Sequence, residues 1–123
     1  MKFTATYVEA NTNTAIANVL FADPETNPDE PLVLMFSRSI EFQDSTYYFE
    51  INDQSYGRYG GLTMVQISRN SIEIHLEPDV IKDFGDENFA EVQVEFTIDD
   101  KTYQSIFDTL KNIFANNTVL VEK

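Results

Sequence analysis

The fold is constrained most strongly by two alternating segments that only two residues separate. Apolar and polar side chains alternate over residues 65–68 and 71–77 within the two segments Leu62–Ser68 and Ser71–Glu77, the period of a β-strand with one buried face. The intervening Arg69-Asn70 predicts a two-residue hairpin loop, because Asn tolerates a positive φ. With Ser68 opposite Ser71, the predicted register pairs Ile67 with Ile72, Val65 with Ile74 and Thr63 with Leu76. Apolar groups then share one face, as a correctly registered hairpin requires.

Alternation elsewhere in the chain predicts more strands. They cover residues 3–7, 15–21, 32–37, 47–51 and 90–98, with 118–121 as a further short strand or part of a loose tail over 116–123. The nearly continuous apolarity of residues 32–37 predicts burial on both faces of that strand. Residues 23–31 hold three prolines and four acids, so we expect a loop there.

One long helix is expected near the end of the chain. Apolar side chains between residues 103 and 114 recur three and four positions apart, with Asp100 as the expected N-cap and Asn116-Asn117 as the expected end. Residues 79–85 predict a shorter helical turn, with Asp79 as N-cap and Gly85 closing it. Together these elements predict a single α+β domain over residues 1–123. Its antiparallel sheet of about seven to eight strands carries one long C-terminal amphipathic helix on one face.

Acidic residues are unevenly distributed along the chain. The net charge is −13, and residues 22–53 and 79–100 each hold eight acids and one base. Such an acidic field repels nucleic acid and anionic membranes and attracts cationic partners. Solvation alone is the other interpretation, because most blocks of like charge are simply hydrated surface.

Composition and the opening residues favour a cytoplasmic protein. The chain has no cysteine, which excludes disulfides and thiolate chemistry. Its longest apolar run, Leu32–Phe36, is far shorter than the ~20 residues that a membrane-spanning helix needs. The opening MKFTATYVEA alternates like a strand and lacks the apolar block of a signal peptide. We therefore expect neither nucleic acid nor a membrane among the partners.

Residues 47–70, YYFEINDQSYGRYGGLTMVQISRN, contain three of the four glycines. The strand over residues 47–51 leads into Asn52–Ser55, a cluster of turn-forming residues, and glycines at 57, 60 and 61 follow. Glycine permits a positive φ and the close approach of another backbone. This segment is therefore the place where we expect an unusual local conformation.

The same segment resembles the immunity protein 10 family of bacterial polymorphic toxin systems. The likeness lies in a strand ending in (Y/F)xEINDQSY, then YGG, then a strand closing in SRN, with an opening MKFTA strand and a closing helix that ends in IF. It spans about residues 1–115, and Gly57 departs from it by replacing a serine or another small polar residue. The resemblance implies a non-enzymatic protein that binds and neutralises a cognate toxin. It also implies a cationic partner such as a nuclease, since many toxins neutralised by immunity proteins are basic nucleases.

Tyrosine and arginine side chains of this segment are the candidate partner-binding residues, because both types are enriched at binding hot spots. The expected anchor is Tyr48, Tyr56, Arg58 and Tyr59, with Glu50 and Asp53 at the rim and Glu91 and Glu95 among the acids that steer a cationic toxin. A purely structural interpretation stays open. In it, Gly60-Gly61 forms a bend or bulge, and Tyr56 and Tyr59 pack over the sheet edge.

No catalytic set is visible in the sequence. His75, the only histidine, is expected on the solvent face between Glu73 and Glu77, whose carboxylates favour its protonated form. A hydrolase or transferase needs a nucleophile, a base and an oxyanion or metal device. A single surface histidine supplies none of these sets, so we expect no catalytic residue.

Metal and cofactor motifs are also missing from the sequence. The alternating acids of residues 23–29 resemble the start of a calcium loop, but Pro28 and Leu34 stand where glycine and glutamate are required. The glycines of residues 57–61 lack the lysine and following helix of a phosphate-binding loop. We therefore expect no metal and no cofactor. The alternatives to an immunity protein are an acidic accessory or scaffold module with another partner, and an enzyme with an acidic site.

Overall fold

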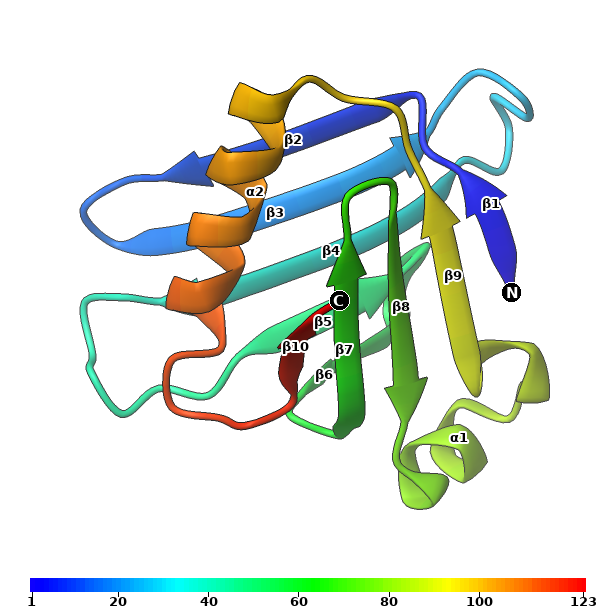
Figure 1. Cartoon of the computed structure of the whole chain (residues 1–123). Helices are drawn as coiled ribbons and strands as arrows, with labels where there is room; N and C mark the ends of the chain where they lie inside the picture. The colour runs from blue at the N-terminus through cyan, green and yellow to red at the C-terminus, as the bar shows by residue number, and fades with distance from the viewer.

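The computed structural model describes all residues 1–123 and arranges ten strands in two five-stranded sheets (Figure 1). The first, called here the antiparallel sheet, has the order β2 (Tyr7–Thr12), β3 (Ile16–Asp23), β4 (Leu32–Ser39), β5 (Tyr48–Ile51), β6 (Asp53–Tyr59). The second, called the mixed sheet, has the order β1 (Lys2–Thr4), β9 (Glu91–Glu95), β8 (Ser71–Leu76), β7 (Leu62–Ser68), β10 (Leu120–Glu122). The helical segments are α1 (Pro78–Phe84), the 3₁₀ turn η1 (Glu87–Phe89) and α2 (Asp100–Ile113).

The α+β class is confirmed, but the expectation of one antiparallel sheet of seven to eight strands is wrong. β1 pairs in parallel with β9, and β10 pairs in parallel with β7, which makes the second sheet mixed. Both parallel pairs join the chain ends to distant segments. Local alternation cannot reveal such pairings, because it shows that a strand has one buried face without showing its neighbours.

The mixed sheet and α2 lie on the same side of the antiparallel sheet, and the strands of the mixed sheet cross those of the antiparallel sheet (Figure 1). Helix α2 packs on β2, β3 and β4 through its buried Ile106, Leu110 and Ile113. Aromatic contacts join the layers: the ring centroids of Phe21 and Phe96 are 5.4 Å apart. The expected long helix on one sheet face is therefore confirmed, and none of the helices is long and apolar enough to span a membrane.

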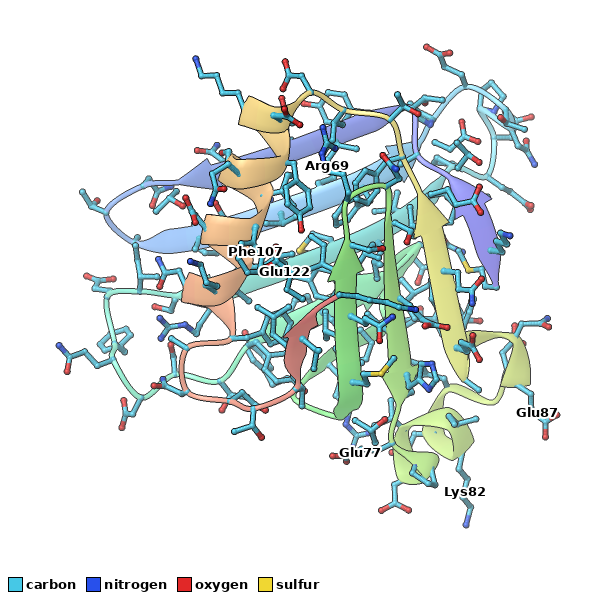
Figure 2. The ribbon with its side chains drawn as sticks, in the orientation of Figure 1. Arg69, Glu77, Lys82, Glu87, Phe107 and Glu122 are labelled. Atoms are coloured by element: carbon cyan, nitrogen blue, oxygen red, sulfur yellow. The ribbon has the colours of Figure 1, made fainter.

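The N-terminal turn of α2 is fastened to the tip of the β7–β8 hairpin, where Arg69 lies in Figure 2. Arg69 donates to the Asp100 carboxylate at 2.7 Å and to the backbone carbonyl of Ile98 at 2.9 Å. The expected cap Asp100 is thus engaged by Arg69. The preceding Asp99 is the N-cap instead, and its carboxylate accepts from the Thr102 N–H at 2.7 Å.

The hairpin register is confirmed at Ser68 opposite Ser71, Ile67 opposite Ile72 and Val65 opposite Ile74. It is wrong at its far end, where Leu62 rather than Thr63 lies opposite Leu76. The register shifts between Leu62 and Met64, a bulge that leaves Thr63 exposed and buries Leu62. One extra residue therefore keeps the apolar side chain inside.

The turn expected over Asn52–Ser55 is wrong in extent. Only Asn52 turns, with φ 66°, and β6 begins at the next residue. The backbone N–H of Asn52 donates to the carbonyl of Val33, and its side-chain Oδ1 accepts from the Val33 N–H at 3.0 Å. Because the backbone and the side chain of Asn52 both bond to Val33 of β4, one left-handed residue is enough to reverse the chain.

The expected N-cap of α1, Asp79, is wrong: the N-cap is Glu77, which makes no side-chain bond, and Pro78 is the first helical residue. The prediction that Gly85 closes the helix is confirmed, since its φ of 71° is left-handed and its N–H donates to Ile81. The C-terminal residues form the short strand β10, one of the two predicted outcomes.

Candidate interaction surface

One face of the antiparallel sheet is not covered by any other element. Helix α2 and the mixed sheet both lie on its other side, which we call the inner face (Figure 1). Phe36 on the inner face is fully buried, whereas Met35 on the outer face is only half-buried. The expectation that residues 32–37 are buried on both faces is therefore wrong, because no second layer covers the outer face.

The cross-strand register places specific side chains together on the outer face. Its central row runs across the five strands as Glu9, Leu20, Met35, Glu50 and Gly57. The adjacent row runs as Asn11, Asn18, Ser37, Tyr48 and Tyr59. Residues that lie directly opposite one another point to the same face of a sheet, so each row is a continuous line of neighbours. The name open face is used here for the outer-face residues of these rows without the two asparagines, together with Tyr7 and Ile16. They are Tyr7, Glu9, Ile16, Leu20, Met35, Ser37, Tyr48, Glu50, Gly57 and Tyr59.

A tyrosine holds each of the two carboxylates of the open face. The Tyr7 hydroxyl donates to Glu9 at 2.6 Å, and the Tyr48 hydroxyl donates to Glu50 at 2.8 Å. Partial burial raises the pKa of Tyr48 to about 12, and the hydrogen bond to Glu50 adds to that shift. The hydrogen bond to Glu9 likewise raises the pKa of Tyr7. Both hydroxyls therefore stay protonated and keep the carboxylates oriented at neutral pH.

The open face contains no basic side chain. The five strands hold only two basic residues, Arg38 and Arg58. Arg38 points inward and donates to the Asn112 carbonyl at 3.0 Å, near the end of α2. Arg58 forms an ion pair with Asp83 of α1 at 2.7 Å. The only charged groups on the open face are consequently carboxylates.

Gly57 makes room for the Tyr48 ring. A Cβ atom at Gly57 would lie 2.0 Å from the Tyr48 hydroxyl oxygen, so a side chain there would displace the ring. Tyr48 in turn packs on Tyr59, with ring centroids 5.1 Å apart. The two rings form one wall of an open hollow of about 460 Å³, which Ile16, Ser37 and the buried Arg38 also line. Gly57, where the chain departs from the family pattern, still pairs with Glu50, and the register between β5 and β6 shifts at the next residue, Ile51, which pairs with Asp53.

The structure separates the predicted site residues into four groups. Tyr48, Glu50 and Tyr59 come together on the open face, and Tyr59 is 73% exposed. Tyr56 and Arg58 point inward, where the Tyr56 ring lies 4.6 Å from Phe89. Asp53 is exposed at the start of β6, and its carboxylate accepts from the Ser55 N–H. Glu91 and Glu95 lie on β9 in the mixed sheet.

The structural interpretation of residues 47–70 predicts a bend at Gly60-Gly61 and the packing of Tyr56 and Tyr59 over the sheet edge. Gly60 and Gly61 have φ of 69° and 93° and form the bend that passes the chain from one sheet to the other. Tyr56 does pack against neighbouring aromatic rings, but Tyr59 contacts solvent over most of its surface. The segment is therefore structural on its inner face and exposed on its outer face.

Sequence reasoning missed the open-face residues outside residues 47–59. They are Tyr7, Glu9, Ile16, Leu20, Met35 and Ser37. The available signal is the apolarity of β3 and β4 at outward positions, which for residues 32–37 predicts burial on both faces instead. A repeated Tyr-x-Glu pattern at residues 7–9 and 48–50 was a second signal, because both pairs lie on the same face.

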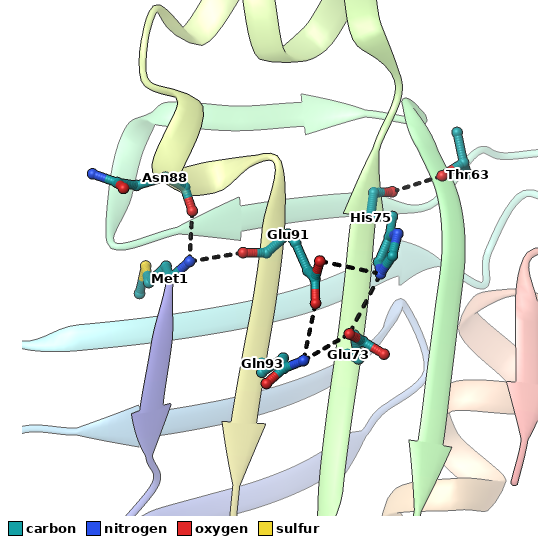
Figure 3. A network of polar contacts seen from close by, with 7 residues as sticks. All are labelled: Met1, Thr63, Glu73, His75, Asn88, Glu91 and Gln93. Carbon is teal, nitrogen blue, oxygen red and sulfur yellow. Dashed lines mark hydrogen bonds and ion pairs between the residues drawn. The ribbon is translucent and has the colours of Figure 1, made fainter.

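The outer face of the mixed sheet is polar and largely satisfied by its own contacts (Figure 3). Gln93 donates to Glu73 at 2.8 Å and to Glu91 at 2.9 Å. A hydrogen bond with the Glu91 carboxyl group, and next the one from Gln93, lower the pKa of Glu73. The carboxylates beside His75 belong to Glu73 and Glu91, at 3.4 and 3.9 Å, rather than to Glu73 and Glu77 as expected.

Comparison with known proteins identifies one family. The family model described as immunity protein 10 matches residues 2–104, which include both sheets except β10 and end within the first turn of α2. No curated protein and no solved structure matches the chain. The family implies a protein without enzymatic activity that neutralises a cognate toxin. The match confirms the resemblance that residues 47–70 indicate, and the chain belongs to the immunity protein 10 family.

Proposed function

We propose that this immunity protein neutralises a cationic toxin domain, such as a nuclease, by binding it on the open face of the antiparallel sheet. One observation carries the proposal: the open face combines uncovered aromatic and aliphatic side chains with carboxylates as its only charged groups. The apolar area supplies short-range affinity, and carboxylates without neighbouring basic groups favour a partner of positive charge.

The anchor of the proposed interface is the pair Tyr48 and Tyr59 beside Leu20 and Met35. Tyrosine contributes a large contact area at a small cost in side-chain entropy and has a polar tip. Glu50 is already oriented by Tyr48, so it can accept a lysine or arginine of the toxin without first losing rotamer freedom. Glu9 is held in the same way at the other end of the central row.

The other predicted residues receive supporting roles in this proposal. Tyr56 and Arg58 hold β6 against η1 and α1 and so set the position of Tyr59. Asp53 contributes to the rim. Glu91 and Glu95, on the mixed sheet, act at a distance by increasing the rate at which a cationic toxin meets the protein, an effect that salt should weaken.

We further propose that the encounter takes place in the cytoplasm, where a nuclease would meet its substrate. Cell fractionation of the producing bacterium tests this placement, since recovery of the protein outside the cytoplasmic fraction would contradict it.

The test is co-expression with the toxin domain encoded immediately upstream, followed by co-purification, a growth assay and titration calorimetry. The wild-type protein should rescue growth and form a stable complex. Tyr59→Ala should weaken binding by more than about 1 kcal/mol while the protein stays folded, because truncating an interface tyrosine removes its contact area.

Val121→Ala is the matched control, because Val121 is also an exposed apolar residue, at 49%, but lies on the mixed sheet. It should bind the toxin as the wild type does. Equal binding by Tyr59→Ala and wild type would overturn the assignment of the open face. Rescue by a complex whose toxin domain is acidic would overturn the proposed charge of the partner.

A further inference from the structure

A second cluster of side chains lies on the outer face of the mixed sheet, apart from the open face. Glu73 and His75 are two residues apart on β8, so both point to the same face, and Glu91 lies directly opposite His75 on β9. Each residue offers one ligand atom, and these atoms all lie within 4.8 Å of one another. Figure 3 shows the three side chains converging from two neighbouring strands.

The spacing of these atoms approaches that of ligands around a tetrahedral ion. Metal–ligand bonds of about 2.0–2.2 Å place two ligands of a tetrahedral Zn²⁺ roughly 3.3–3.6 Å apart. Nε2 of His75 lies 3.4 Å from Oε1 of Glu73 and 3.9 Å from Oε2 of Glu91. The Glu91 side chain is 49% exposed, so it has the freedom to close the remaining gap.

Nε2 of His75 is the atom in this cluster that lacks a hydrogen-bond partner. It is buried, although the His75 side chain as a whole is 39% exposed, and no hydrogen bond reaches it. A buried polar atom without a partner costs free energy, and coordination to a metal ion would remove that cost. Imidazole nitrogen is also the commonest metal ligand among side chains.

Gln93 holds the two carboxylates in the orientation that coordination requires. Its amide nitrogen bridges Oε1 of Glu73 and Oε1 of Glu91, and the other Glu91 oxygen, Oε2, lies 3.9 Å from Nε2 of His75. Residues that hydrogen-bond the ligands in this way orient metal sites and tune their affinity. Gln93 is therefore a positioning residue and not a ligand.

The neighbouring cations are occupied elsewhere and do not neutralise the cluster. Lys2 pairs with Glu95 at 3.1 Å. The N-terminal ammonium of Met1 donates to the backbone carbonyls of Asn88 and Glu91 at 2.6 and 2.8 Å (Figure 3). Two adjacent carboxylates thus have His75 as their only side-chain partner able to carry positive charge within 4 Å.

We propose that Glu73, His75 and Glu91 bind a divalent transition-metal ion, Zn²⁺, with water in the outward coordination position. One imidazole with two carboxylates suits such an ion better than Mg²⁺, which prefers an octahedral shell of oxygen ligands. The ion would join β8 to β9 and stabilise the folded state by binding to it selectively.

The experiment is titration calorimetry of the untagged, metal-free full-length protein with Zn²⁺ and, separately, with Mg²⁺. We expect Zn²⁺ to bind and to raise the thermal midpoint until EDTA is added, and Mg²⁺ to do neither. His75→Gln should abolish Zn²⁺ binding, and Gln93→Ala should weaken it about 10–100-fold. Glu95→Gln, on the same strand and face but outside the cluster, should bind Zn²⁺ as the wild type does.

Two results would overturn the proposal. The first is a folded wild-type protein that shows no heat and no thermal shift with Zn²⁺, in which case the three side chains only contact one another. The second is equal Zn²⁺ affinity in wild type and His75→Gln, which would place the ion on other surface acids. Both readouts are independent of toxin binding, so neither result depends on the proposed function.

Discussion

The two sheets each expose an outer face to solvent, but the outward side chains at the centre of these faces differ in polarity. On the mixed sheet the outward side chains are largely charged or polar and pair with one another, as Glu73, Gln93 and Glu91 do. On the antiparallel sheet the central outward positions are Leu20 and Met35. A face that satisfies its own polar groups gains little from a protein partner, whereas a face with uncovered apolar area gains from being covered.

The difference also separates stability from recognition within one strand. β6 sends Tyr56 and Arg58 inward to η1 and α1, and sends Tyr59 outward to solvent. Because strand residues alternate between faces, neighbours in sequence can serve different purposes. The predicted partner-binding cluster therefore divides according to the strand period.

The largest effect is expected from a cation introduced on the open face, compared with the same cation on the outer face of the mixed sheet. Met35→Arg should lower toxin affinity by about 100-fold or more, because the guanidinium would repel a cationic toxin and pair with Glu50, its cross-strand neighbour. Met64→Arg is the matched control, since Met64 is also half-buried and lies beside His75 on the mixed sheet. Calorimetry with the purified toxin domain measures both, and equal losses would remove the distinction between the faces.

The inward side of β6 should affect stability and not recognition. Tyr56→Ala should lower the free energy of unfolding by about 1–3 kcal/mol, because it removes ring contacts with Phe84 and Phe89. Urea unfolding measures the loss. Toxin affinity of the folded variant should stay near that of the wild type, and a large loss of affinity without a loss of stability would move Tyr56 into the interface.

A smaller effect is expected from a methyl group at Gly57. Gly57→Ala should displace the Tyr48 ring, break its hydrogen bond to Glu50 and lower toxin affinity about tenfold, or 1.4 kcal/mol. A double-mutant cycle with Tyr48→Ala tests the cause. If the ring carries the effect, the double variant should bind no more weakly than Tyr48→Ala alone, and additive losses would contradict this explanation.

The smallest effect concerns alkaline pH. The folded-state pKa of Tyr48 is raised from 10.0 to about 12, so its contribution to stability is complete below pH 10 and is lost as the pH rises toward 12. A tyrosinate absorbance titration of Glu50→Gln should show ionisation of Tyr48 at lower pH than in the wild type. An unchanged titration would mean that Glu50 contributes nothing to the shift.

The Tyr103 hydroxyl provides an internal reference for that titration. Its pKa is also raised to about 12, first by burial and next by the hydrogen bond to Glu122, which lies on β10 beside α2 (Figure 2). Tyr103→Phe should therefore remove a late ionisation that Glu50→Gln leaves unchanged. Toxin bound on the open face should affect Tyr48 and not Tyr103.

Sequence reasoning was most successful where a structure depends on neighbours in the chain. The hairpin register around Arg69-Asn70, the apolar stripe of α2 and the left-handed Gly85 are all correct, since turn length, helical period and the conformational freedom of glycine are local properties. The same reasoning names Tyr48, Glu50 and Tyr59 but groups them with Tyr56 and Arg58, which point inward, because the two faces of β6 cannot be separated before β6 is known to be a strand.

The sequence by itself thus determined most of the strands, the long helix, the acidic character and the family. It did not reveal β6, and the single strand expected over residues 3–7 is wrong, since β1 and β2 are separate strands in different sheets. Tertiary structure alone decided that there are two sheets, that β1 and β10 join the mixed sheet, and that Glu91 lies beside His75. It also decided that the outward residues of β3 and β4 stay uncovered. The physical reason is that strand pairing and layer packing are contacts between distant segments, and a period of two specifies which residues share a face but not what that face meets.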